Sequence, residues 1–110
     1  MTQVKFLSGP GGINGFEISG HCSLDSDDET GRVVCAAVSS AAYMTANTIT
    51  DVIGDKAEVQ IDDALMRLCV KTPSSSASAV LEGLRLHLTE LSGQYGDNIR
   101  IYGGAKHVKD

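Results

Sequence analysis

The spacing of apolar residues changes twice from a two-residue period to a helical period along the chain, which constrains the fold more than any other feature of the sequence. Residues 4–7 and 15–19 alternate around the Gly9–Gly12 cluster and predict a first hairpin. A helical period then predicts a helix over 33–53, stopped by Gly54. Its expected core stripe comprises Val34, Val38, Ala41, Thr45, Ile49 and Val52.

The second half of the chain repeats this change of period. Residues 57–61 and 66–70 alternate as a second hairpin, with Asp62–Asp63 as its turn. Thr72–Pro73 fits an N-cap and a first helical residue, so we expect a second helix from that point. Its core stripe comprises Leu81, Leu84, Leu88, Leu91 and Tyr95. Residues 99–102 then predict a last strand.

The resulting order is ββαββαβ, which predicts an α+β fold with two helices on one face of a mostly antiparallel sheet. The 110 residues suit a single domain over 1–110. One face of such a sheet is left without helices. We expect a homodimer to cover part of that face, and an exposed apolar patch would be its signature.

Charge and hydropathy narrow the classes of partner and location. Nine Lys and Arg against 14 Asp and Glu give a net charge of −5, which argues against direct nucleic-acid binding and favours a basic peptide. No run reaches the roughly 18 apolar residues of a membrane span, and the N-terminus lacks the long apolar stretch of a signal peptide. We therefore expect a cytoplasmic protein without a membrane partner.

Cys35 and His21 are the main candidates for catalytic residues. Cys35 falls at the predicted start of the first helix, where the helix dipole favours a thiolate. His21 ends a strand 35 − 21 = 14 residues earlier, and a loop of that length permits a hydrogen bond between the two. From spacing alone, a buried core cysteine and a structural histidine remain the better interpretation.

A sequence resemblance makes the catalytic interpretation of Cys35 and His21 the better one. Gly20-His21, an acidic loop, and then the segment Gly31-Arg32-Val33-Val34-Cys35-Ala36-Ala37-Val38-Ser39 resemble the signature of the ribosomal-processing cysteine protease family Prp, G-H followed by G-x-D-I-V-C-A-A-V-S. The segment 95–101 and the element order resemble the family too. The resemblance implies an endopeptidase that removes the N-terminal extension of large-subunit ribosomal protein number twenty-seven. It places the nucleophile on Cys35 and the base on His21, and implies no cofactor.

The chain departs from the family at Arg32, which stands where an acidic residue is usual. Carboxylates of residues 25–29 are candidates to replace it, although such an acidic run is more often a solvated loop. The alternative is that Arg32 assists catalysis, since a cation near Cys35 stabilises its thiolate.

Three other residues are candidates for supporting roles. Ser39 follows Cys35 by four residues on the same helical face, where its hydroxyl either approaches the sulfur or bonds back to the Cys35 carbonyl. Gly20 and Gly31 bracket the acidic loop, as hinges of a lid or as ordinary turn glycines. Backbone N–H groups at the helix start are the expected oxyanion donors.

Two alternatives to a protease remain open from the residues. A non-catalytic, dimeric, ribosome-associated module would bind a peptide without a reactive thiol. A metal site of His21, Cys22, Cys35 and a loop carboxylate has suitable ligand types but lacks paired C-x₂-C spacing, so we expect no metal. Cys22 and Cys69 are expected to serve packing, as reduced thiols of a cytosolic protein.

Overall fold

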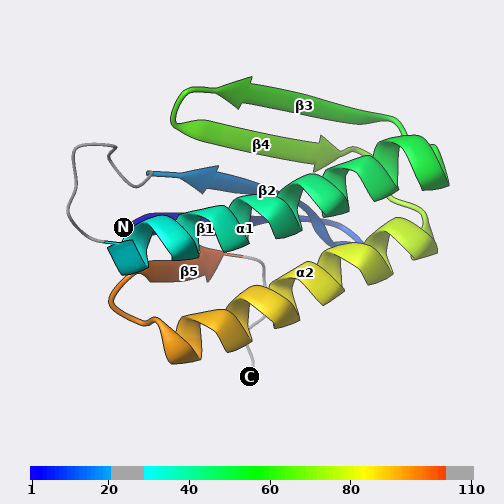
Figure 1. Cartoon of the computed structure of the whole chain (residues 1–110). Helices are drawn as coiled ribbons and strands as arrows, with labels where there is room; N and C mark the ends of the chain where they lie inside the picture. Colours follow the sequence, from blue (N-terminus) through cyan, green and yellow to red (C-terminus); the bar gives the residue numbers. More distant parts are fainter. Residues whose placement is uncertain (21–28, 104–110) are drawn as a thin grey trace.

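The computed structural model describes residues 1–20 and 29–103, which form a five-stranded sheet with two long helices on one face (Figure 1). The order ββαββαβ agrees with the sequence prediction. The elements are β1 (Thr2–Gly9), β2 (Gly12–Ser19), α1 (Glu29–Asn47), η1 (Thr48–Ile53), β3 (Ala57–Asp62), β4 (Leu65–Val70), α2 (Ser75–Gln94) and β5 (Ile99–Gly103).

The strands lie in the order β3-β4-β2-β1-β5. Three neighbouring pairs are antiparallel and β1 with β5 is parallel, so the sheet is mostly antiparallel as predicted. Phe6 lies directly opposite Phe16 across β1 and β2, and both side chains are buried. Because alternate strand residues share a face, Val4 and Ile18 join them in the core under the helices.

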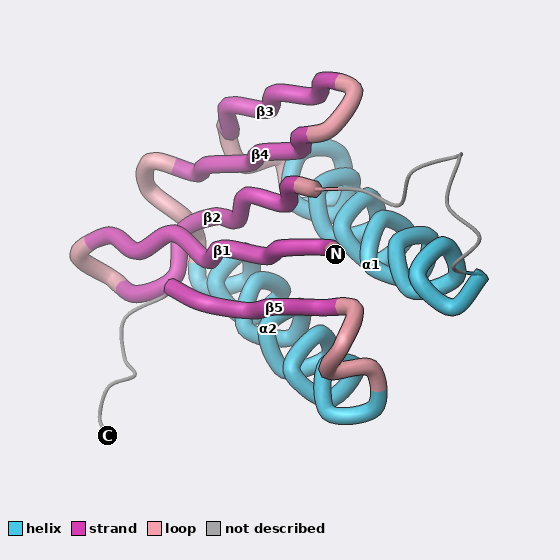
Figure 2. Tube along the Cα trace, turned by 90° about the vertical axis from the view of Figure 1, so that its left-hand side faces the viewer, coloured by secondary structure: helices cyan, strands magenta, loops and turns pink. Residues whose placement is uncertain are grey.

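Among the residues that the structure describes, no helix covers the opposite face of the sheet (Figure 2). Most of its side chains are polar, including Gln3, Lys5 and Arg100, and Arg67 Nε lies 3.5 Å from Glu17 Oε2 on the neighbouring strand. The apolar patch expected as the sign of a dimer is therefore not a feature of this face. A polar sheet face of this kind is stable in contact with water.

The first helix begins four residues earlier than the sequence predicts, at Glu29. It continues into η1, a π-helical turn in which Gly54 N donates to Ile49 O, five residues back, at 3.0 Å. This wider turn shifts the helical phase beyond Ile49. Val52, expected in the core stripe, is consequently 79% exposed. Gly54 ends the helix with φ of 87°, as expected of a glycine stop.

The continuous helical segment Glu29–Ile53 is long and apolar enough to span a membrane when judged by length and composition alone, because an 18-residue window within it has a mean hydropathy of 1.2. This test differs from a search for an unbroken apolar run, since polar residues such as Arg32 and Asp51 interrupt the segment. Its buried residues, among them Val34, Val38 and Ile49, belong to the core cluster formed with the sheet and α2. Core helices of water-soluble proteins pass the same test.

The second helix begins at Ser75 and not at Pro73. Ser74 is the N-cap, because its Oγ accepts a hydrogen bond from Ala77 N at 3.1 Å. Ser74 N also donates to Asp55 Oδ2 at 2.8 Å, which fixes the cap against the segment before β3. This contact between residues distant in sequence selects Ser74 over Thr72 as the cap.

Candidate active site

Cys35 lies on α1 with its side chain half-buried, at the wall of a cavity of about 130 Å³. The cavity is bounded by α1 on one side and by the β3–β4 hairpin on the other, with the end of β2 between them. It is lined by Ile18, Gly20, Cys35, Ser39, Tyr43, Ile61, Asp62, Asp63, Ala64, Leu65 and Met66. The structure therefore places two of the predicted supporting residues, Gly20 and Ser39, around the same cavity as Cys35.

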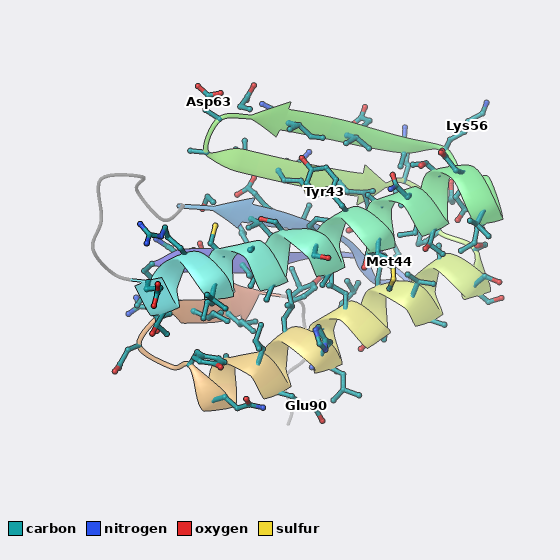
Figure 3. The ribbon with its side chains drawn as sticks, viewed as in Figure 1. Tyr43, Met44, Lys56, Asp63 and Glu90 are labelled. Atoms are coloured by element: carbon teal, nitrogen blue, oxygen red, sulfur yellow. The ribbon has the colours of Figure 1, made fainter. Side chains whose placement is uncertain are left out.

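One helical stripe forms the α1 wall. Cys35, Ser39 and Tyr43 follow one another at intervals of four residues and so project from the same face. Tyr43 points from α1 toward the β3–β4 hairpin (Figure 3). Sequence reasoning missed Tyr43 as a wall residue, although the spacing from Cys35 was visible in the sequence.

The hairpin forms the opposite wall. Its two-residue turn consists of Asp63 and Ala64, while Asp62 is the last residue of β3 and pairs with Leu65. The prediction that Asp62 and Asp63 make the turn was therefore correct for Asp63 only. Sequence reasoning also missed that this turn and Ile61 face the predicted nucleophile, because only the tertiary packing of α1 beside the hairpin brings them together.

The position of Cys35 within α1 corrects the sequence prediction. Cys35 is six residues beyond Glu29, the first residue of the helix, and therefore lies in its second turn. The N–H groups without an intrahelical acceptor are the first four, and the effect of the helix dipole declines within the first turn. The helix start therefore offers Cys35 neither direct stabilisation of a thiolate nor oxyanion donors.

Ser39 differs from three threonines that follow it in the same helical segment. Thr45, Thr48 and Thr50 each donate to the carbonyl four residues earlier. In the described part of the chain, no such bond is recorded from Ser39 Oγ to the Cys35 carbonyl. The side chain instead lines the cavity, where its hydroxyl is available to a ligand.

Gly20 leads the chain away from the end of β2 beside the cavity. Its φ is 69°, and a Cβ at this position would lie 2.6 Å from the carbonyl oxygen of Met1. Only glycine adopts this conformation without strain and fits this approach. The sequence interpretation of Gly20 as a turn glycine agrees with this geometry.

Gly31 and Arg32 occupy the first turn of α1, and neither lines the cavity. Gly31 therefore does not bracket the loop as a hinge, since the helix begins two residues before it. His21, Cys22 and the acidic residues 25–28 lie outside the described residues. The predicted dyad of His21 with Cys35 consequently stays a prediction.

The cavity rim is negatively charged. Asp62 Oδ2 accepts from Gln60 Nε2 at 3.0 Å, and Asp63 is exposed. The ion pairs recorded among residues 1–20 and 29–103 join Arg67 with Glu17 and Arg85 with Glu82, so neither rim carboxylate has a cationic partner there. In the same residues, no group of three or more His, Cys, Asp or Glu is arranged to hold a metal ion.

Comparison with known proteins identifies the family. Residues 1–100 match the sequence profile of the family described as Cysteine protease Prp. The chain belongs to this family. Membership confirms the resemblance inferred from the segment around Cys35, and the Prp family assignment makes the protein a cysteine protease. Among curated proteins, no sequence matches this chain.

Solved structures share the Prp-like fold of the chain. A protein of Streptococcus mutans has a TM-score of 0.81 and 21% identity, covering 94% of this chain and 96% of that chain. An essential ribosomal processing protease Prp from S. aureus, in complex with a substrate peptide, has a TM-score of 0.81 and 20% identity, covering 93% and 99%. The same S. aureus enzyme with a covalently linked product peptide has a TM-score of 0.79 and 21% identity, covering 94% and 99%.

Proposed function

We propose that this cysteine protease removes the N-terminal extension of large-subunit ribosomal protein number twenty-seven, with Cys35 as nucleophile and His21 as general base. The observation that carries the proposal is the opening of Cys35 onto a cavity within a family of cysteine proteases. The S. aureus relative is described as a ribosomal processing protease and binds a substrate peptide, which supports the same class of substrate here.

The proposed reaction follows from the chemistry of a thiol nucleophile. His21 takes the proton of Cys35, and the thiolate attacks the carbonyl carbon of the scissile peptide bond. The C–N bond then breaks, His21 returns the proton to the leaving amine, and a thioester remains on Cys35. Water hydrolyses the thioester and restores the thiol. No cofactor or metal takes part in these steps.

Ser39 is the proposed oxyanion donor. Its hydroxyl lies one helical turn from Cys35 on the same face and lines the cavity. An O–H group aimed at the developing negative charge stabilises the tetrahedral intermediate more than the substrate. This assignment replaces the helix-start N–H groups, which the early beginning of α1 places away from Cys35.

Electrostatics favour a basic peptide substrate. Asp62 and Asp63 border the cavity without a cationic partner in the described residues, and the chain carries a net charge of −5. Such a field concentrates cationic peptides near the site and repels the phosphate backbone of nucleic acid. The cytoplasm, where ribosomal proteins are assembled, is the proposed location.

We further propose a homodimer that uses the helical side of the molecule. A groove of about 690 Å³ lies between α1 and α2, with Val80 and Leu84 in its wall, and Met44 beside it is 68% exposed. A second copy that covers this groove would bury apolar surface. Sedimentation of wild type and Met44→Glu tests the proposal, because a dimer should become monomeric in the variant and an unchanged mass would contradict it.

A cleavage assay on the precursor of the ribosomal protein from the same organism tests the proposed function. Wild type should release the extension, Cys35→Ala and His21→Ala should be inactive, and Cys22→Ala should remain active. Binding of the precursor without cleavage by wild type would replace the protease with the non-catalytic binding module. Cleavage that persists in Cys35→Ala would assign the nucleophile elsewhere.

A further inference from the structure

A second free thiol, that of Cys69 in β4, lies on the face of the sheet away from the helices. Its neighbours Leu68 and Val70 are buried in the core, and side chains alternate along a strand, so Cys69 points the other way. It is half-buried and borders a groove of about 620 Å³, within the range of small-molecule sites, about 300–1,000 Å³. Among the described residues, this groove and the cavity beside Cys35 have no lining residue in common. Cys69 therefore lies outside the core packing expected from the sequence and is open to a small molecule.

Strand β2 leaves space over Cys69 and places an unpaired polar atom beside it. Gly15 lies directly opposite Cys69 and has no side chain to cover the thiol. The register of β1 with β2 skips Asn14, and such a β-bulge re-aims the side chain of the extra residue. Asn14 lines the groove, and its Oδ1 atom is buried without a hydrogen-bond partner among the described residues. A buried carbonyl oxygen of this kind is costly unless an N–H group donates to it, and a ligand in the groove would supply one.

Two lysines give the groove a positive charge. The last pair of the β3–β4 register is Ala57 with Val70, and one further step brings Lys56 opposite Lys71, where like charges repel. Both lysines border the groove, and the ion pairs recorded in residues 1–20 and 29–103 include neither of them. With Glu58 as the acidic lining residue, the groove has one more positive than negative side chain, in a chain of net charge −5. A carboxylate bound between the lysines would relieve their repulsion.

We propose that this groove binds a small peptide disulfide that carries carboxylates, of the glutathione type, and that Cys69 forms a mixed disulfide with it. Lys56 and Lys71 bind the carboxylates, and a peptide N–H group donates to Asn14 Oδ1. Lys56 lies at the opposite end of the β3–β4 hairpin from Asp63, which borders the cavity beside the catalytic thiol (Figure 3). The inference is therefore independent of the proposed protease substrate.

The covalent step is a thiol–disulfide exchange. The thiolate of Cys69 attacks one sulfur of the bound disulfide, a bond forms between Cys69 Sγ and that sulfur, and the original S–S bond breaks. The other half of the reagent leaves as a thiolate and takes up the proton that Cys69 lost. The bound disulfide is thus the oxidant, and the departing thiol is its reduced half. A second small thiol reverses the exchange and restores Cys69.

Exchange with two disulfide reagents tests the site without any ribosomal substrate. Oxidised glutathione carries carboxylates and peptide N–H groups, whereas bis(2-hydroxyethyl) disulfide is neutral and has no peptide group. The rate of mixed-disulfide formation at Cys69 is measured by peptide mapping of acid-quenched protein. The rate with oxidised glutathione is divided by the rate with the neutral reagent in the same variant, which cancels changes in the reactivity of the thiol itself. N-acetylcysteine amide, a neutral thiol, gives the reference ratio.

The wild-type ratio should exceed the reference ratio about fivefold or more at low salt, and the excess should shrink in 0.5 M salt because ions screen exposed charges. Lys56→Gln and Lys71→Gln should each lower the ratio about two- to fivefold, the range of an exposed charge pair. Asn14→Ala should lower it as well, because the acceptor for the peptide N–H group is lost. Lys5→Gln is the matched control and should keep the ratio, since Lys5 is exposed on β1 outside the groove lining.

Each outcome decides for or against the site. A wild type whose Cys69 is not modified, or whose ratio equals the reference, would overturn it. Lysine variants that keep the full ratio with native circular dichroism would overturn it too. An equal loss in Lys5→Gln would assign the preference to net charge and reject the groove. Lysine-dependent modification of Cys69 in a protein that does not cut the ribosomal precursor would keep the site and reject only the proposed substrate.

Discussion

Tyr43 lies 43 − 35 = 8 residues after Cys35 in α1, and both side chains line the cavity beside the β3–β4 hairpin. Because the two residues belong to one helix, their separation is set by helix geometry at about 12 Å along the axis. The proposed nucleophile and a second wall residue of the cavity are thus held on one rigid element. The hairpin on the other wall belongs to a separate element, so its position relative to α1 sets the width of the cavity between them.

Ser39 provides the first prediction. Ser39→Ala should lower kcat about 100-fold with little change in KM, because an oxyanion donor acts in the transition state and not on bound substrate. Ser40→Ala is the matched control, since Ser40 is the next residue of α1 and lines the α1–α2 groove instead. Steady-state kinetics on the precursor peptide measure both constants. Equal kcat in Ser39→Ala and Ser40→Ala would remove Ser39 from the mechanism.

Asp63 tests the preference for a basic peptide. Asp63→Asn should raise KM up to about fivefold for a lysine-containing peptide at low salt, the range expected for an exposed charge pair. The difference from wild type should shrink in 0.5 M salt, because ions screen exposed charges. Glu90→Gln changes the net charge equally but lies on α2, away from the hairpin (Figure 3). If both variants change KM alike, net charge and not the rim governs binding.

The sequence predicted the order of elements because the apolar period reports directly on strands and helices. It did not predict features that depend on contacts between residues distant in sequence, such as the N-cap of α2 and the exposure of Val52. Ser74 N donates a hydrogen bond to Asp55, 19 residues away, and this contact favours Ser74 as the N-cap of α2. The π-helical turn η1 exposes the side chain of Val52 to water. Local patterns contain no information on either event.

In the candidate active site too, local sequence patterns predict some residues, and contacts between distant segments determine the others. Cys35 stands out in the sequence through its motif, and Ser39 follows from helical spacing. Ile61 and Asp63 belong to a hairpin and follow Cys35 by 26 and 28 residues, so their place opposite Cys35 depends on how α1 packs beside the sheet. A wrong helix start, at residue 33 and not at Glu29, was sufficient to misassign the oxyanion donors.

Phe16 tests the core that supports the site. Its side chain is fully buried opposite Phe6 and lies on the strand that continues to Ile18 in the cavity floor. Phe16→Ala should lower the free energy of unfolding by about 3–5 kcal/mol, since it removes a large buried ring and leaves a cavity. Tyr102→Ala, on the polar sheet face, should change it by less than about 1 kcal/mol. Urea denaturation measures both, and similar losses would contradict the assigned core.

Two glycine substitutions should change stability in opposite directions. Gly20→Ala should lower the free energy of unfolding by about 1–3 kcal/mol, because its φ is 69° and its Cβ would approach the Met1 carbonyl oxygen to 2.6 Å. Gly83→Ala should raise it by up to about 1 kcal/mol, since Gly83 lies within α2 with nothing within 4 Å of the added Cβ. Thermal denaturation of both variants beside wild type measures the difference. Because Gly20 borders the cavity and Gly83 does not, only Gly20→Ala should also slow cleavage, and a stable, fully active Gly20→Ala would refute the strained turn at the end of β2.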